Sequence, residues 1–167
     1  MIYMQRRSVI AAVEMVLVFG LFTFLFQFAW EVLQLPFYKG MAAMNHWEGT
    51  LVCLRATGGD LMIALAAFAA GAWWSKRVDW MLDPSREVVV IYVMAGLLIT
   101  IAFEWYAVFW ANRWAYSELM PVIPVLRVGL APILQWLVLP PITLYFVHWH
   151  YVGRLGKHIP ATSKDRK

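Results

Sequence analysis

The chain has 167 residues, of which 62% are hydrophobic and 14% are charged, and its formal net charge is +4. A chain with so few polar residues cannot form the water-exposed surface of a soluble domain of this size. The composition therefore excludes a soluble globular protein and predicts an integral membrane protein. The basic residues are interleaved and no groove-reading motif accompanies them, so the positive charge does not indicate nucleic-acid binding.

Four apolar stretches are long enough to cross a bilayer as helices: residues 9–35, 50–74, 88–109 and 129–149. A hydrocarbon core of about 30 Å needs roughly 20 apolar residues per helix. The stretches predict an all-α, polytopic four-transmembrane-helix bundle that forms one domain over residues 1–167, with a basic tail at 150–167. The first stretch is too long for a signal peptide and lacks a small-residue cleavage site, so we expect it to be retained.

Lys and Arg residues are unevenly divided between the two ends of the predicted helices. They precede the first helix, lie between the second and third, and follow the fourth, whereas the opposite loops hold only Lys39, Arg113 and Arg127. Cytoplasmic loops carry the excess of positive charge, so we expect both termini in the cytoplasm. We expect a bacterial cytoplasmic (inner) membrane, with contacts to anionic membrane lipids.

Tryptophan side chains favour the two membrane–water interfaces because their rings are amphipathic. We expect an outer group of Trp47, Trp105, Trp110 and Trp114 and an inner group of Trp73, Trp74, Trp80 and Trp149. Both groups agree with the predicted helix ends.

Charged and amide side chains inside the predicted helices are concentrated in the outer half of the membrane. Glu31 lies near the outer end of the first helix, Asp60 roughly 15 Å deep in the second, Glu104 in the outer quarter of the third and Gln135 about two turns into the fourth. The inner half holds only Glu14. A charge at a helix centre costs at least about 2.5–3.5 kcal/mol, so each of these groups needs a partner or a function.

Helical spacing predicts that these groups face the interior of the bundle. Three faces combine polar and small residues: Gln27, Glu31 and Gln34; Cys53, Thr57, Asp60, Ala64 and Ala67; and Gly96, Thr100, Glu104 and Ala107. Small residues indicate close approach between helices. We also expect Gly58-Gly59, Pro132 and Pro140-Pro141 to interrupt helices beside a cavity, where irregular backbone is tolerated at membrane depth.

Residues 110–127 (WANRWAYSELMPVIPVLR) are too amphipathic and too interrupted by proline to cross the membrane. They predict an interfacial or re-entrant segment between the third and fourth helices. Arg113 and Tyr116 of this segment would then lie above the carboxyl groups.

We interpret Asp60, Glu104 and Glu31 as candidate catalytic residues. A buried carboxylic acid and an ionised carboxylate together supply the proton donor and acceptor for isomerisation, cyclisation or hydration of an isoprenoid- or lipid-like substrate. Asp60 and Glu104 would act as acid and base, while Glu31 would stabilise developing positive charge. The candidate substrate-binding residues flank this group in the predicted outer half: Gln34, Arg55, Thr57, Trp105, Arg113, Tyr116 and Gln135.

Three other interpretations fit the same residues. In the first, the cluster is a structural network in which Arg55 or Arg113 pairs with carboxylates and the glutamines fill the remaining hydrogen bonds. In the second, the chain is an accessory subunit of a larger membrane complex or a homo-oligomer. The third, a proton-coupled transporter, is less favoured because no inverted repeat is visible and the inner half has no matching polar path.

The sequence predicts no cofactor. The single cysteine, Cys53, excludes a CxxC metal or redox motif. Met41, Met44 and His46 are soft ligands of the kind that copper(I) accepts, but methionine in an interfacial loop more often faces lipid. A copper site is therefore a minor alternative.

The segment WEVLQLPF, residues 30–37, locally resembles a Glu-x-x-x-Gln-Leu-Pro-Phe segment of the emopamil-binding and related sterol-isomerase-like family of small helical membrane bundles. Here Glu31 and Gln34 are one residue closer together, and the match covers fewer than ten of 167 residues. The segment also falls in the first helix, whereas the family places its acidic residues differently along the chain. The resemblance implies a lipophilic substrate and does not extend to family membership.

Overall fold

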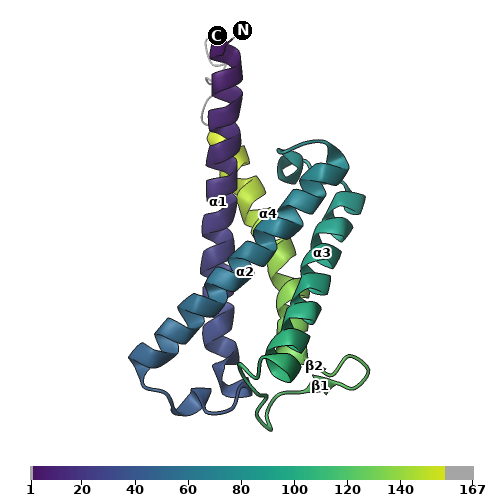
Figure 1. The fold of residues 1–167 in the computed structure, drawn as a ribbon. Helices are drawn as coiled ribbons and strands as arrows, with labels where there is room; N and C mark the ends of the chain where they lie inside the picture. Colours follow the sequence, from purple (N-terminus) through teal and green to yellow (C-terminus); the bar gives the residue numbers. More distant parts are fainter. Residues whose placement is uncertain (1, 157–167) are drawn as a thin grey trace, which may run out of the picture.

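A computed structural model describes residues 2–156, with side chains described for residues 10–153; the last part of the predicted basic tail lies outside the described residues. Over this range the chain forms four long helices, and a π-helical turn, Tyr106–Trp110, extends the third. They are α1 (Ile2–Gln34), α2 (His46–Ser75), α3 (Arg86–Trp105) and α4 (Leu130–Gly156) (Figure 1). All four are long and apolar enough to cross a membrane, which agrees with the predicted bundle.

Two of the helices begin earlier than the hydrophobic pattern predicts, because polar residues form their first turns. Asn45 caps α2 by accepting a hydrogen bond from the backbone N–H of Glu48 at 3.0 Å. Ser85 caps α3 in the same way, accepting from the N–H of Val88 at 3.4 Å. Side-chain caps of this kind satisfy N–H groups that a helix start leaves unpaired, so His46 and Arg86 become helical although neither is apolar.

The loops at the end of the bundle opposite the chain termini are joined to each other. The α1–α2 loop contains two 3₁₀ turns, Leu35–Phe37 and Met41–Ala43, and the α3–α4 loop contains the short antiparallel strands β1 (Val122–Ile123) and β2 (Val128–Gly129) (Figure 1). A single bridge between Tyr38 and Tyr116 connects the two loops. The segment predicted as interfacial or re-entrant is thus an irregular loop with a small hairpin.

The predicted helix interruptions are wrong. α2 passes through Gly58 and Gly59 without a break, and α4 passes through Pro140 and Pro141. Pro132 lies in the first turn of α4, where a backbone N–H has no helical acceptor and its absence costs little. The space inside the bundle therefore comes from how the helices are oriented.

α2 runs obliquely across α1 and α3 and sets the shape of the bundle (Figure 1). α1 packs against α2 and α4, and α3 packs against the same two helices. Towards its N-terminal end, α2 diverges from α3, and this end lies on the side of the two joined loops. The polar halves of the helices meet where this divergence leaves room.

An aromatic core fills the half of the bundle nearer the termini. Trp80, in the 3₁₀ turn Trp80–Leu82 between α2 and α3, stacks on Phe68 at 5.6 Å and meets Tyr92 at 5.5 Å between ring centroids. The Trp80 side chain is fully buried, so it packs inside the protein and does not face lipid. It fits because Gly71 leaves room: a Cβ there would lie 3.0 Å from the indole ring.

Trp136 of α4 occupies a second glycine-lined position. Its ring is fully buried against Gly96 of α3, and a Cβ on Gly96 would lie only 2.0 Å from a ring carbon. Without a side chain at Gly96, the indole can pass directly over the α3 backbone. The small-residue face predicted for α3 therefore has a steric cause.

We predict that Gly96→Ala destabilises the protein. Overpacking typically costs about 1–3 kcal/mol, which exceeds the roughly 1 kcal/mol that alanine gains over glycine in a helix. Gly58→Ala in α2 is the matched control, because nothing lies within 4 Å of a Cβ at that position. Thermal unfolding in detergent should give a lower Tm for Gly96→Ala than for the control. Equal Tm values would contradict the close approach of Trp136.

Candidate functional site

One cavity of about 620 Å³ lies between the helices at the end that carries the two joined loops. All four helices and both loops line it, and its volume is within the range of about 300–1,000 Å³ that is typical of small-molecule sites. Its wall contains most of the polar residues singled out from the sequence: Glu31, Gln34, Arg55, Asp60, Thr100, Glu104, Arg113 and Gln135.

The side-chain amide of Gln135 joins three helices at this cavity. Its nitrogen lies 2.6 Å from Oε1 of Gln27, 2.9 Å from Oδ2 of Asp60 and 3.4 Å from Oε1 of Glu31. The amide nitrogen has two hydrogens, so the shorter contacts to Gln27 and Asp60 are the stronger ones and Glu31 is a weaker third acceptor. Glu31 and Asp60 therefore lie side by side as a carboxyl pair.

A second amide orients Glu31. Gln34 donates to Oε1 of Glu31 at 2.6 Å, and its own Oε1 accepts from the indole N–H of Trp30 at 3.2 Å. An indole nitrogen can only donate, so the amide oxygen of Gln34 must face Trp30. The NH₂ group of the same amide then faces Glu31. The relay lies on α1, where the i, i+3, i+4 spacing of these residues places them on one face.

Glu104 occupies a separate position on the wall, at the end of α3. Its Oε2 accepts a hydrogen bond of 2.5 Å from the Tyr116 hydroxyl and lies 3.5 Å from the indole nitrogen of Trp114. The ring of Tyr38 lies 5.9 Å from that of Tyr116 and 6.3 Å from that of Trp114. Aromatic residues of both loops therefore enclose this carboxyl group, which is buried.

Tyr116 is a neutral donor to Glu104. Burial, together with the nearby Glu104 carboxyl group, raises the pKa of the Tyr116 phenol above its ordinary value. The phenol therefore keeps its proton throughout the physiological pH range. A persistent O–H donor at short distance stabilises the ionised form of Glu104.

The carboxyl groups are not neutralised by arginine. Arg55 and Arg113 line the cavity, yet in the described part of the chain no ion pair joins either of them to a carboxyl group. Amide, phenol and indole groups provide the hydrogen bonds instead. The arginine pairing of the structural network considered from the sequence is therefore absent among the described residues, whereas its glutamine hydrogen bonds are present.

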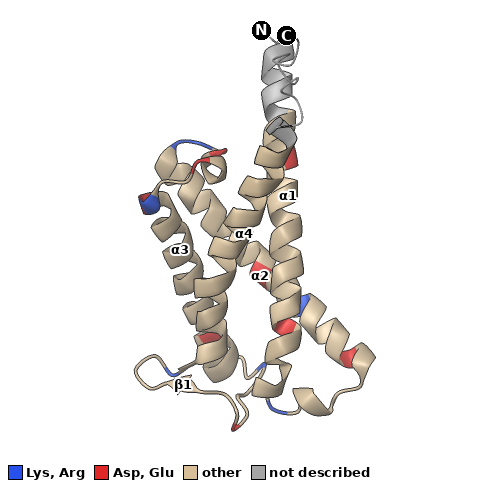
Figure 2. Cartoon of the chain, turned by 180° about the vertical axis from the view of Figure 1, so that it is seen from behind, with Lys and Arg blue, Asp and Glu red and all other residues tan. Residues whose placement is uncertain are grey.

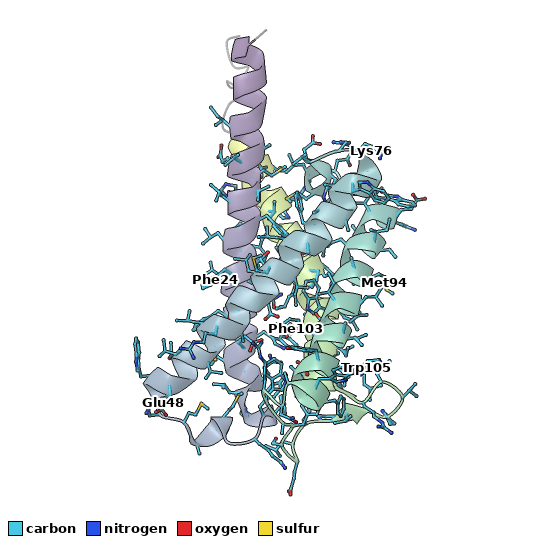
Figure 3. The ribbon with its side chains drawn as sticks, in the orientation of Figure 1. Phe24, Glu48, Lys76, Met94, Phe103 and Trp105 are labelled. Atoms are coloured by element: carbon cyan, nitrogen blue, oxygen red, sulfur yellow. The ribbon has the colours of Figure 1, made fainter. Side chains whose placement is uncertain are left out.

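Three of the predicted substrate-binding residues do not line the cavity: Tyr116, Thr57 and Trp105. Tyr116 is connected to it only through its hydrogen bond to Glu104. Thr57 is completely buried, and its hydroxyl has no hydrogen-bond partner among the described residues. Trp105 is 47% exposed and donates to the carbonyl oxygen of Leu126 at 2.5 Å. In Figure 3, Trp105 lies on the opposite side of α3 from Phe103, which does line the cavity.

The candidate copper ligands are divided by the fold. Met41 and Met44 line the cavity, whereas His46 at the start of α2 does not. Within the described residues, no group of three or more His, Cys, Asp or Glu side chains is placed to hold a metal ion. Copper binding stays an untested hypothesis.

Sequence reasoning missed several residues of the site. Tyr38 and Trp114 are a loop tyrosine and a predicted interface tryptophan, and only the pairing of the two loops brings them to Glu104. Gln27 was placed only on the polar face that it shares with Glu31, one helical turn later, and was not chosen as a site residue. Its partner on α4, Gln135, was chosen from the sequence, but the hydrogen bond between them was not predicted.

Comparisons of the chain with models of protein families, with curated proteins and with solved structures returned no match.

We predict that Gln27 and Gln135 are energetically coupled. Replacing either with leucine leaves a buried polar group without its partner, which costs about 1–3 kcal/mol. In the double variant neither glutamine is left without the other, and the loss of the Gln135 hydrogen bond to Asp60 is common to Gln135→Leu and the double variant, so it cancels. The double variant should therefore be more stable than the sum of the single effects implies, by about 0.5–3 kcal/mol. Chemical denaturation of Gln27→Leu, Gln135→Leu and the double variant measures this coupling. Strictly additive effects would contradict the 2.6 Å hydrogen bond.

Proposed function

We propose that the protein is an integral membrane enzyme that carries out acid/base chemistry on a lipophilic, isoprenoid- or lipid-like molecule. The reaction would be an isomerisation, a cyclisation or a hydration. The observation that carries this proposal is that two different carboxyl sites, the Glu31–Asp60 pair and Glu104, border a single cavity of about 620 Å³. A proton donor and a proton acceptor around one space are what such reactions require.

The carboxyl pair is suited to hold one proton. Two adjacent carboxylates repel each other, so sharing one proton is favoured in a site with little water. Each member accepts one close amide hydrogen bond, Glu31 from Gln34 and Asp60 from Gln135. In this proposal Asp60 is the member that passes the shared proton to the substrate, and Glu31 then keeps the negative charge.

Glu104 is suited to the opposite role. Donation from Tyr116 and Trp114 favours its ionised form, which makes it the proton acceptor. In an isomerisation, Asp60 gives its proton to one carbon of a C=C bond, and Glu104 removes a proton from a carbon next to the resulting cation. The double bond thereby moves by one position, and returning the proton from Glu104 to Asp60 restores the starting state.

The cationic intermediate of this scheme has stabilising groups nearby. The Glu31 carboxylate provides negative charge, and the faces of Tyr38 and Trp114 provide cation–π attraction. In a hydration, the oxygen of a water molecule bonds to the cation while Glu104 removes one proton from that water, which leaves the neutral alcohol. The remaining wall is mostly apolar, as a hydrocarbon substrate requires.

The other half of the bundle argues against a proton pathway across the membrane. A continuous core that includes Phe19, Phe68, Trp80, Tyr92 and Trp136 lies between the cavity end and the end with the termini. Its buried members, over the residues described, carry no charge. Intramembrane proton relays use chains of ionisable groups, so a pocket open from one end is the better interpretation.

We propose the orientation and membrane predicted from the sequence, with cytoplasmic termini in a bacterial inner membrane. The cavity would then belong to the non-cytoplasmic leaflet. In support, the basic residues Lys76, Arg77 and Arg86 of the α2–α3 connection lie at the same end as the termini, as Figure 2 illustrates. An excess of Lys and Arg is typical of cytoplasmic loops.

We predict that Asp60→Asn and Glu104→Gln abolish turnover without unfolding the protein. General acid–base groups contribute about 10²–10⁴-fold, so each variant should lower product formation at least about 100-fold. Lipid extracts of cells with and without the protein, compared by mass spectrometry, identify substrate and product. Glu48→Gln is the control, because Glu48 is exposed in the first turn of α2 and does not line the cavity.

Two results would count against the enzyme. One is an identical lipid profile with and without the protein. The other is a stoichiometric protein partner after mild solubilisation together with unchanged lipids, which would favour the accessory-subunit alternative. The Tm of each variant in detergent separates loss of chemistry from loss of folding.

The orientation can be tested with single cysteines in a Cys53→Ser background. Val125 in the β1–β2 turn and Val78 in the α2–α3 connection are both exposed, at opposite ends of the bundle. A membrane-impermeant maleimide should label Val125→Cys in intact cells and Val78→Cys only after permeabilisation. The reverse pattern would overturn the proposed orientation.

A further inference from the structure

Two arginines stand at the accessible edge of the cavity. Arg55 comes from α2 and Arg113 from the loop after α3; both line the cavity and both are exposed. Neither forms an ion pair in the part of the chain that the structure describes. The guanidinium groups are therefore free to bind an anion.

Arg55 has no ion-pair partner among the described residues although it lies within a helix long enough to cross a membrane. It lies nine residues after His46, about 13 Å along α2, inside a segment long and apolar enough to cross a membrane. A cation at such depth is costly unless an anion or water compensates it. The carboxyl groups of the cavity do not compensate it, because their hydrogen bonds go to Gln34, Gln135 and Tyr116.

A second unpaired polar group lies deeper in the same cavity. Thr100 of α3 is only 6% exposed and lines the cavity, yet its hydroxyl has no hydrogen-bond partner among the described residues. Buried hydroxyl groups are usually hydrogen-bonded, so an unpaired one on a cavity wall can form a hydrogen bond with a molecule bound there. Apolar side chains such as Val52 and Ile63 provide the surface between these polar groups.

The volume limits the size of that molecule. Allowing about 30 Å³ for each water-sized group, the cavity of about 620 Å³ holds roughly 20 non-hydrogen atoms. That is enough for one hydrocarbon chain of moderate length with a small head group. Both chains of a membrane phospholipid do not fit.

We propose that the cavity binds a single-chain lipid phosphate. Its head group is held by Arg55 and Arg113, and its chain runs past the carboxyl groups. Guanidinium groups bind phosphate through paired, charge-assisted hydrogen bonds, and two of them match its charge of nearly −2. This inference rests on the proposed function, because it names the substrate class of the same site, but it is tested by binding alone.

The test uses farnesyl phosphate and the neutral alcohol farnesol as probes, with the full-length protein in phosphatidylcholine nanodiscs. Wild type should bind farnesyl phosphate at least about tenfold more tightly than farnesol, and Arg55→Gln and Arg113→Gln should each weaken phosphate binding about tenfold. Farnesol binding should not change. Arg127→Gln, at an exposed loop arginine that does not line the cavity, should behave like wild type.

Two further arms identify the source of the anion. Inorganic phosphate at millimolar concentration should not displace farnesyl phosphate, because it lacks the chain. Nanodiscs that contain phosphatidylglycerol should leave the affinity unchanged. If phosphatidylglycerol displaces the probe, the arginines bind bulk membrane lipid and the proposal is overturned. Equal affinity for farnesol and farnesyl phosphate, or unchanged binding in both cavity-arginine variants, would also overturn it.

Failure of this inference can be told apart from failure of the proposed enzyme. Asp60→Asn should bind farnesyl phosphate like wild type while losing turnover. If the arginine variants bind farnesyl phosphate normally but the carboxyl variants still lose turnover, the proposed enzyme is supported and the proposed lipid phosphate is overturned. If farnesyl phosphate binds as expected but cellular lipids are unchanged by the protein, the site binds a lipid without converting it.

Discussion

The bundle depends on a hydrogen-bonding constraint that hydrocarbon imposes: a polar side chain inside it must find its partner in the protein. Gln135 of α4 meets this requirement for Gln27 of α1 and Asp60 of α2 at once. Three helices are therefore fixed relative to each other at the level where apolar packing is interrupted by a cavity. Without that amide, the oxygen atoms of two other helices would be buried unpaired, so the cavity and the fold are maintained by the same contact.

The two halves of the bundle divide stability from chemistry. In one half, glycine positions let Trp80 and Trp136 pack against helix backbones, and the aromatic core closes the structure. In the other half, α2 diverges from α3, and two paired loops cover the space between them. Figures 1 and 2 show this division along the bundle: the chain termini lie at the first end and the loops at the second. The closely packed half therefore adjoins the half that contains the cavity.

The candidate site could be predicted in outline from the spacing of polar residues, but its pairing could not. The spacing places Glu31, Asp60 and Glu104 at similar depth on inward faces, and the structure brings all three to one cavity. The spacing alone does not show that Glu31 and Asp60 form a pair while Glu104 lies apart among aromatic rings. Tyr116 reaches Glu104 only because the two loops contact each other. The same spacing places Thr57 on an inward face, and it is fully buried, but spacing within one helix could not show that the cavity does not extend to it.

The sequence by itself determined that four long apolar helices form, and which face is buried in the first three, because lipid requires satisfied backbone hydrogen bonds and excludes exposed polar side chains. Only the tertiary structure decided where those faces open into a cavity. The oblique course of α2, the insertion of Trp80 and the unpaired state of Arg55 all depend on contacts between residues distant in sequence. Hydropathy and helical period act within one helix, whereas a cavity is a property of the space between several.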